Sequence, residues 1–369
     1  DLLMAVPVDN TTGYSYQFQN FGKTSNRGIE LSVNVDVINK GDFRFNVGAI
    51  YNYNRNKLDE LPNADQYLYS SYWGSSSLVP TNDYMFVEGK AIGLVRGFIS
   101  EGYYTVDDFN YTNGQYVLKE GVPDITKALT ATYMHPYDLP AGQTAFPGAA
   151  KFRDVDESGT VDLDDATCLG EVMPRHTGSF QLNFNYKNFD LSTNFNWTAG
   201  GKVYNVAAMI NASGQEFDGI GAQRASWVAD AFKVYNVNAA GDLYAVTNPD
   251  ELRALNANAK YHLPYHQSGI TSSEWLENGS YLRLQTLTLG YTLPKNWLTK
   301  VHVDKIRLYL TATNLFTITG YSGIDPEVNA NPTGQSGFYS DLRIFPTLNM
   351  DFGTYPRART FTFGANITF

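Results

Sequence analysis

An acidic run in the first half of the chain has the residue types and spacing of a calcium-binding loop. The stretch DVDESGTVDLDD extends from Asp154 to Asp165. Such loops place oxygen ligands at positions one, three, five, seven and nine, a glycine at six and a carboxylate at twelve. Aspartate replaces the usual bidentate glutamate at twelve, so we expect weak binding, and a solvated acidic turn is the alternative. The predicted calcium ligands are Asp154, Asp156, Ser158, Thr160, Asp162 and Asp165.

Aromatic residues gather in the stretches that show no regular hydrophobic pattern. Flat rings offer a large apolar contact at low entropic cost, and they suit stacking on sugars or packing against a partner protein. Long loops also need small cores of their own, so packing within the loops is the alternative for most of these rings. The residues predicted to contact substrate or a partner are Tyr72, Trp73, Tyr103, Tyr104, Trp227, Trp275, Phe338 and Tyr339.

Signs of other chemistry are few. His262 and His266 have the spacing of a helical metal pair, but Pro264 between them is incompatible with the helix that such a pair requires. No nucleophile elbow, phosphate-binding loop or Cys/His pair occurs, so we expect no enzyme activity. Cys168 is the single cysteine, which excludes an internal disulfide. The net charge of −10, without a basic run, argues against nucleic-acid binding.

The elements that would carry these stretches are strands with one apolar and one polar face. The last nine residues, FTFGANITF, place an aromatic or aliphatic side chain at almost every second position. This period of two indicates a strand between an apolar and a polar medium. A change of phase within the fifth such segment predicts a β-bulge near Gln285. Seven segments of this kind occur, at 29–37, 43–53, 180–186, 189–197, 282–293, 306–312 and 361–369.

Strand and connection lengths favour a membrane barrel over a soluble sandwich. Each segment is about as long as the 9–11 residues with which a tilted strand crosses a bilayer. The connections alternate between short ones, at 39–42, 187–188 and 294–303, and long ones, at about 55–176, 198–280 and 317–358. Outer-membrane barrels alternate short periplasmic turns with long extracellular loops in this way. No apolar stretch is long enough for a transmembrane helix.

The strand count predicts that the chain is part of a larger barrel. If the short turns lie in the periplasm, Phe369 ends at the periplasmic face and residue 1 lies outside. Complete bacterial barrels have an even number of strands, so seven strands with an external start indicate the C-terminal portion of a barrel. The start at DLLMAVPV, without a signal peptide, likewise suggests a mature product or a fragment.

Several longer motifs resemble one transporter family. They are SNRGIEL, FRDVDESGTVDLDD, ENGSYLRLQTLTLGYTLP, LTATNLFTITGYSGIDPEVN and YPRARTFTFGANITF. Together, and in this order, they resemble the C-terminal half of SusC/RagA-family TonB-dependent outer-membrane transporters, typical of Bacteroidetes. The resemblance implies a 22-strand antiparallel barrel whose plug and N-terminal strands are absent here. It also implies a SusD-like surface lipoprotein as partner, and contact with the TonB complex through the missing N-terminal part.

We therefore expect an all-β chain in which residues 1–369 form the C-terminal part of a transmembrane β-barrel in the bacterial outer membrane. The resemblance implies active import of oligomeric nutrients, either glycan or peptide. The acidic loop makes calcium the candidate cofactor. A passive porin or adhesin barrel is the first alternative. A soluble β-rich carbohydrate-binding module is the second, and it would be extracted without detergent.

Overall fold

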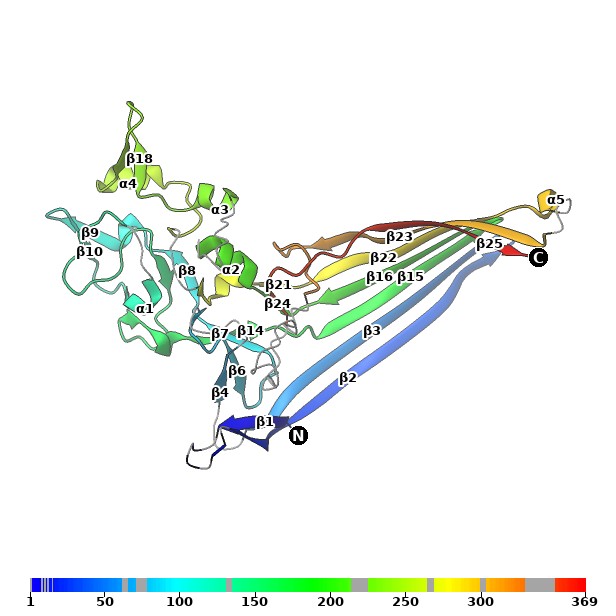
Figure 1. Cartoon of the computed structure of the whole chain (residues 1–369), viewed down its shortest axis with the longest axis horizontal. Coiled ribbons are helices and arrows are strands. Elements are labelled where there is room, and N and C mark those ends of the chain that lie inside the picture. The colour runs from blue at the N-terminus through cyan, green and yellow to red at the C-terminus, as the bar shows by residue number, and fades with distance from the viewer. Residues whose placement is uncertain are drawn as a thin grey trace.

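A single antiparallel sheet extends along more than half of the molecule in the computed structural model (Figure 1). Its eight strands follow one another in space in the order β1-β2-β3-β15-β16-β22-β23-β25. Neighbours in the sheet are thus neighbours in the sequence, apart from the elements of the long connections. The strands are β1 (Leu2–Pro7), β2 (Tyr16–Lys40), β3 (Phe43–Glu60), β15 (His176–Tyr186), β16 (Phe189–Ala199), β22 (Tyr281–Thr292), β23 (Lys305–Thr319) and β25 (Thr360–Thr368).

The structure describes most of the chain. The described residues are 2–7, 9, 11, 13–14, 16–61, 66–70, 78–130, 135–213, 225–263, 269–298, 303–328 and 349–369.

The seven alternating segments form the seven long strands of the sheet, in the expected order, which confirms the predicted all-β fold. The predicted bulge is present, because the pairing of β22 with both neighbours shifts register beside Gln285. Two features differ from the expectation. β1 adds an eighth, short strand beside the first residues of β2. β2 and β3 are also longer than their alternating segments, and β3 continues to Glu60.

One face of the sheet is covered by exposed apolar side chains. Phe361 and Phe363 of β25 are 64% and 74% exposed, and Leu31 and Leu289 are exposed on other strands. A soluble sandwich would pack these side chains against a second sheet. In the described structure they instead form a continuous apolar outer surface, as on the lipid-facing side of a barrel. The exposed set on these strands includes Ile29, Leu31, Val33, Val35, Val37, Phe189, Leu289, Leu310, Phe361, Phe363 and Ile367.

The short connections all lie at one end of the sheet. They are the turn at 41–42, the turn at 187–188 and the link between β22 and β23, which contains α5 (Lys295–Leu298). The C-terminal end of the chain lies at this same end, and the N-terminal end lies at the other, beside the long connections (Figure 1). Within the described residues, no helix is both long and apolar enough to span a membrane.

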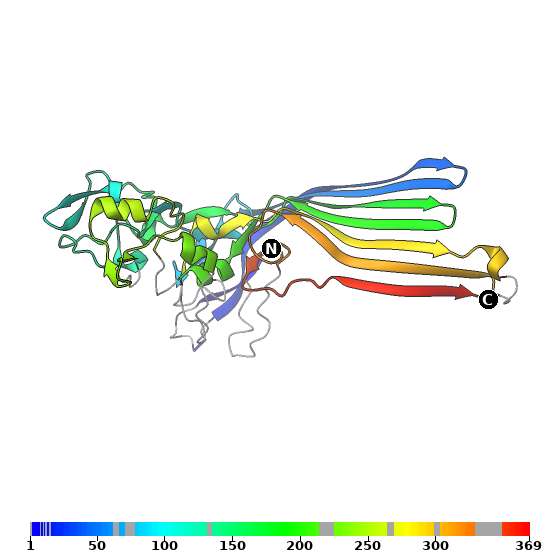
Figure 2. The same ribbon diagram turned by 90° about the horizontal axis from the view of Figure 1, so that it is seen from above.

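The long connections fold into a head at the opposite end of the sheet (Figures 1 and 2). The head consists of short strands and helices. Some of its strands pair with strands that are distant in the sequence, as β5 does with β20. The first connection contributes β4 (Gln66–Tyr69), β5 (Leu78–Val79), β6 (Tyr84–Val87), β7 (Leu94–Gly97), β8 (Ser100–Tyr103), η2 (Val106–Asp108), β9 (Phe109–Thr112), β10 (Gln115–Leu118), β11 (Asp124–Ile125), α1 (Lys127–Thr130), β12 (Ala150–Phe152), β13 (Thr160–Val161), η3 (Leu163–Asp165) and β14 (Thr167–Glu171).

The later connections supply the remaining elements of the head. Backbone hydrogen bonds join them to the first connection, for example from the Phe98 amide to the Thr271 carbonyl at 2.9 Å. The elements are β17 (Lys202–Asn205), α2 (Val206–Ser213), α3 (Ala225–Asp230), β18 (Tyr235–Val237), β19 (Leu243–Ala245), α4 (Pro249–Leu255), β20 (Gly269–Ile270), η4 (Ser273–Trp275), β21 (Leu276–Asn278) and β24 (Met350–Asp351).

Two hydrophobic clusters hold the head together. The outer cluster, far from the sheet, includes Phe98, Tyr104, Phe146 and Phe152. The inner cluster joins the head to the sheet, and it contains Leu58 at the end of β3 together with residues of β6, β17, α2 and η4. Burial of large side chains in these clusters provides the driving force that a long unpatterned loop would otherwise lack. Members of the inner cluster include Tyr84, Phe86, Tyr204, Met209, Trp227 and Trp275.

Candidate functional site

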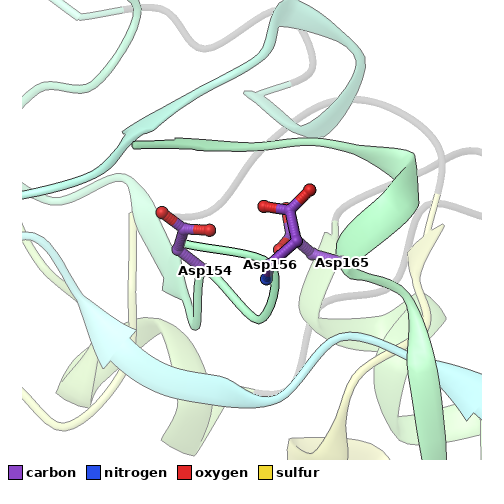
Figure 3. Close-up of side chains that lie close together, drawn as sticks. All are labelled: Asp154, Asp156 and Asp165. Carbon is purple, nitrogen blue, oxygen red and sulfur yellow. The ribbon is translucent and has the colours of Figure 1, made fainter. Parts of the chain in front are cut away.

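The predicted calcium loop brings three carboxylates together. One oxygen each of Asp154, Asp156 and Asp165 lies within 4.8 Å of the other two (Figure 3). Asp154 accepts hydrogen bonds from the amides of Ser158, at 3.1 Å, and Gly159, at 2.7 Å. Gly159 has a φ of +88°, which glycine adopts without the steric cost of a side chain. The loop therefore curls around its first carboxylate.

Asp165 closes this loop from its far end. The side chain is buried, and its two oxygens accept hydrogen bonds from the amides of Val155, at 2.6 Å, and Asp162, at 2.8 Å. These bonds hold both ends of the loop together. Asp156 is exposed, and the hydrogen bond from Ser158 lowers the pKa of its carboxyl, so it carries negative charge at neutral pH.

The other predicted ligands have partners within the loop. The Ser158 hydroxyl donates to the Thr160 carbonyl at 3.0 Å, and Asp162 accepts the Asp164 amide at the start of η3. Three converging carboxylates are a donor set that suits a hard cation such as calcium. A cation at this position would have three carboxylate ligands from the protein, fewer than the six ligand residues that the motif predicts, and water would complete its coordination.

The predicted aromatic contact residues fall into different environments. Tyr104 is buried in the outer cluster and donates to the Pro123 carbonyl at 2.7 Å, so its ring supports the head from within. Tyr103 is half-buried, and its hydroxyl donates to the Ala259 carbonyl at 3.0 Å. Tyr72, Trp73, Phe338 and Tyr339 lie outside the described residues.

Trp227 and Trp275, by contrast, line a cavity of about 300 Å³ between α2, α3 and β21. Two of the elements that line it, α2 and β21, lie near the end of the sheet that meets the head (Figure 1). Trp227 stacks on Tyr261, a third lining residue, with ring centroids 5.0 Å apart. Its indole N–H is buried without a hydrogen-bond acceptor in the described structure.

Three carboxylates share the lining of this cavity. Asp230 accepts a hydrogen bond from Lys260 at 2.8 Å, and Glu277 accepts the Ser322 amide at 2.7 Å. Glu274 has no hydrogen-bond or ion-pair partner among the described residues. Burial raises the pKa of Glu274 to about 7, since removal from water disfavours its charged form. Nothing local in the sequence indicated this grouping, because Asp230 and Glu274 lie more than forty residues apart within the second long connection.

The polar face of the sheet carries a network of side-chain hydrogen bonds. Asn46 donates to Asn34 at 2.7 Å and to Asp36 at 2.9 Å, and on the neighbouring strands Ser192 donates to Asn183 at 2.6 Å. These residues are the polar members of the alternating segments. The polar residues thus gather on one face, as the alternation predicted.

A buried ion-pair cluster lies at the head end of the same sheet. Arg283 of β22 is 2% exposed and donates to Asp325, to Glu327 at 3.0 Å and to the hydroxyl of Thr317 at 3.0 Å. Arg357 donates to the other oxygen of Glu327 at 2.6 Å. Residues 325–327 and 357 belong to the third long connection and flank its undescribed part. The cluster therefore fixes both ends of that connection to the sheet.

Relatives of known name align with the whole chain. The TonB-dependent receptor P3 of Formosa agariphila is 30% identical over 370 residues, which cover 100% of this chain and 31% of that receptor. The TonB-dependent receptor SusC of Bacteroides thetaiotaomicron is 24% identical over 379 residues, covering 100% of this chain and 29% of SusC. No protein-family model matches the chain.

Solved structures give the same result for the fold. The RagAB peptide transporter aligns over 100% of this chain and 32% of its own, with a TM-score of 0.63 at 20% identity. This chain resembles SusC-like TonB-dependent receptors in sequence over its whole length, and it has the fold of the matching part of the RagAB transporter. It spans about a third of the length of the relatives it matches.

Two of the expectations from sequence agree with these relatives. The relatives are receptors and transporters, which agrees with a protein that is not an enzyme. They place the chain in the bacterial outer membrane, and the exposed apolar face of the sheet suits contact with lipid.

The YLRL and GIDPE motifs meet in space, because Arg283 belongs to the first motif and Asp325 and Glu327 belong to the second.

Proposed function

We propose that this SusC-like chain forms part of the barrel wall and the extracellular head of a transporter that imports oligomeric nutrients with energy from the TonB system. The observation that carries the proposal is the likeness of the whole chain to about a third of a TonB-dependent receptor, together with a sheet that has one exposed apolar side. The long connections at about 55–176, 198–280 and 317–358 are then extracellular, and the short turns are periplasmic. This placement agrees with the general orientation of outer-membrane barrels.

The remainder of the same transporter is the first proposed partner. In the described structure the sheet does not close on itself. One edge is β25, and the other is formed by β1 and by the part of β2 beyond residue 22, which β1 does not cover. An open strand edge in lipid leaves backbone groups without partners, which is strongly unfavourable. The missing strands would pair with these edges, and the plug would fill the lumen and carry the contact to TonB.

A SusD-like surface lipoprotein is the second proposed partner. The head projects beyond the sheet and presents exposed apolar residues on the β18–β19 hairpin, among them Val237 and Leu243. A lipoprotein that covers the head would enclose substrate above the lumen. Co-purification of a lipoprotein with the tagged whole transporter tests this arrangement, and recovery of the transporter alone from mild detergent would contradict it.

The cargo is proposed to be a peptide or a glycan too large for passive pores. RagAB is a peptide transporter, and this precedent supports a peptide without deciding against a glycan. The test is uptake of labelled oligopeptides and oligosaccharides by cells that carry the transporter, by cells that lack it, and by cells that lack TonB. Active import predicts that uptake is lost in both mutants, whereas a passive barrel would keep working without TonB.

Calcium is the proposed cofactor of the head. Its ligands would be Asp154, Asp156 and Asp165, with Ser158, the Thr160 carbonyl and Asp162 available if the loop rearranges. A bound cation would offset the mutual repulsion of the three carboxylates and stiffen the loop. It would have no part in substrate chemistry.

A further inference from the structure

We propose that the cavity between α2, α3 and β21 binds a cationic group of the imported substrate, an ammonium or guanidinium carried by a basic side chain or an amino sugar. This inference rests on the proposed import function and narrows the substrate class. The supporting observations are the charge of the lining, the aromatic rings and a carboxylate without a partner.

The charged residues that line the cavity are all acidic among the described residues. Asp230, Glu274 and Glu277 contribute three carboxyl groups, and no lysine or arginine is among the described lining residues. Lys260 neutralises only Asp230. Glu277 is held by neutral donors, the amide and hydroxyl of Ser322 and the side chain of Asn205. A cation that entered would meet uncompensated negative charge in a partly dehydrated space, where electrostatic attraction is stronger than in water.

The aromatic rings suit the same ligand. Trp227, Trp275 and Tyr261 line one cavity, and the electron-rich faces of such rings attract ammonium and guanidinium groups. A volume of about 300 Å³ accommodates one side chain or one sugar ring, not a whole oligomer. The site would therefore recognise one residue of a longer substrate.

Among the lining residues, Glu274 is the one whose carboxyl group would gain a partner when a cation binds. Its carboxyl group lines the cavity from a partly exposed side chain and has no hydrogen-bond or ion-pair partner among the described residues, so a cationic ligand would supply one. Because its pKa is raised to about 7, Glu274 is mostly neutral at pH 5.5 and mostly ionised at pH 8. The other titratable groups facing the cavity are Asp230, Glu277 and Tyr261, and His262 packs against the edge of Trp227. Cation binding should strengthen as the pH rises between these values.

The test uses matched ligands in which an amine is either free or acetylated. Purified whole transporter in detergent is titrated calorimetrically with an end-blocked lysine peptide and the same peptide with acetylated lysine at pH 8, then with a glucosamine trimer and its N-acetylated form at pH 7, because a sugar amine is less basic than lysine and still carries its proton there. We expect one amine ligand to bind about tenfold more tightly than its acetylated counterpart. Whichever pair shows the preference identifies the source of the cation. Equal affinity within both pairs, or no binding of any ligand, overturns the inference.

Variants then tie the preference to the cavity. Glu274→Gln should abolish the preference for the amine, and Glu274→Asp should keep part of it, which separates loss of charge from a folding defect. Glu120→Gln, an exposed glutamate elsewhere on the head, should behave like the wild type. A Glu274→Gln protein with undiminished preference would contradict the inference. The uptake experiment decides the import function independently, since it compares cells with and without TonB and needs no charge preference.

Discussion

Arg283 in β22 donates a 3.0 Å hydrogen bond to Glu327, which lies in the connection that follows β23. The same guanidinium also binds Asp325, and both Arg283 and Asp325 are buried. A buried arginine is stable only when its donors are satisfied, so Arg283 depends on its buried acidic partner. The two ends of a long loop are thereby fixed at the rim of the sheet.

The first prediction concerns this cluster. Arg283→Met leaves Asp325 buried without its partner, which should destabilise the protein by about 3–5 kcal/mol. Arg357→Met is the matched control, because Arg357 binds the same glutamate from a half-exposed position and should matter by no more than about 1 kcal/mol. Denaturant unfolding of the purified transporter, followed by tryptophan fluorescence, measures both. Equal losses of unfolding free energy in the two variants would mean that burial does not determine how much each arginine contributes to stability.

The second prediction concerns the lipid-facing side of the sheet. Val33 lies on the exposed apolar face near the middle of the part of β2 expected to lie in the membrane, so Val33→Arg should destabilise the barrel by about 2–4 kcal/mol. Ser32→Arg places the same side chain on the opposite, polar face and should be tolerated. Heat-modifiable mobility of the folded barrel in detergent gels reports the difference. If Ser32→Arg were the more harmful variant, the assignment of faces would be reversed.

The third prediction separates the metal role of the acidic loop from its structural role. Asp156→Ala removes an exposed carboxylate, so calcium affinity should fall at least about tenfold while the head stays folded. Asp165→Ala removes the acceptor of the Val155 and Asp162 amides, and it should destabilise the head even without calcium. Calcium titration and limited proteolysis, with and without chelator, distinguish the two. Identical protease patterns with calcium and with chelator would contradict a stiffening role for the ion.

The sequence predicts the strands that have one apolar and one polar face, and it does not predict the others. The long strands were predictable because one face of each strand is apolar and the other is polar. Successive side chains point to opposite faces, so apolar residues such as Leu31 alternate with polar residues such as Ser32. β1 was missed because its sequence, LLMAVP, is apolar throughout and has no period. The head was predicted only as long loops, since strands such as β5 have two residues and are stabilised by distant partners.

Of the candidate sites, the sequence predicts the one that is local in sequence and misses those assembled from distant segments. Asp154, Asp156 and Asp165 were found from spacing, because a cation loop is local in sequence. Glu274 and Trp227 meet only after two parts of a long connection fold against α2, so no window of sequence contains the cavity. The Arg283 cluster had a weak signal, a lone arginine in an otherwise neutral strand, but its acidic partners lie more than forty residues away.

The last prediction follows from His262, which is fully buried against Trp227 and whose Nδ1 lies 2.9 Å from the Leu263 carbonyl. Burial lowers the pKa of His262 to about 4, against about 6.5 in the unfolded chain. Between these values the unfolded state binds more protons, so the stability that neutral His262 provides is complete above about pH 6.5 and decreases as the pH falls toward 4. The slope contributed is at most about 1.4 kcal/mol per pH unit.

His262→Gln should remove this contribution, because glutamine keeps a polar side chain of similar size and does not titrate. The measurement is the unfolding midpoint of wild type and variant at pH 4.5, 5.5 and 7.5. Glu274 acts in the opposite direction, since its raised pKa of about 7 favours the folded state at low pH, so the comparison must be the difference between variant and wild type at each pH. A constant difference across this range would show that His262 does not titrate with folding.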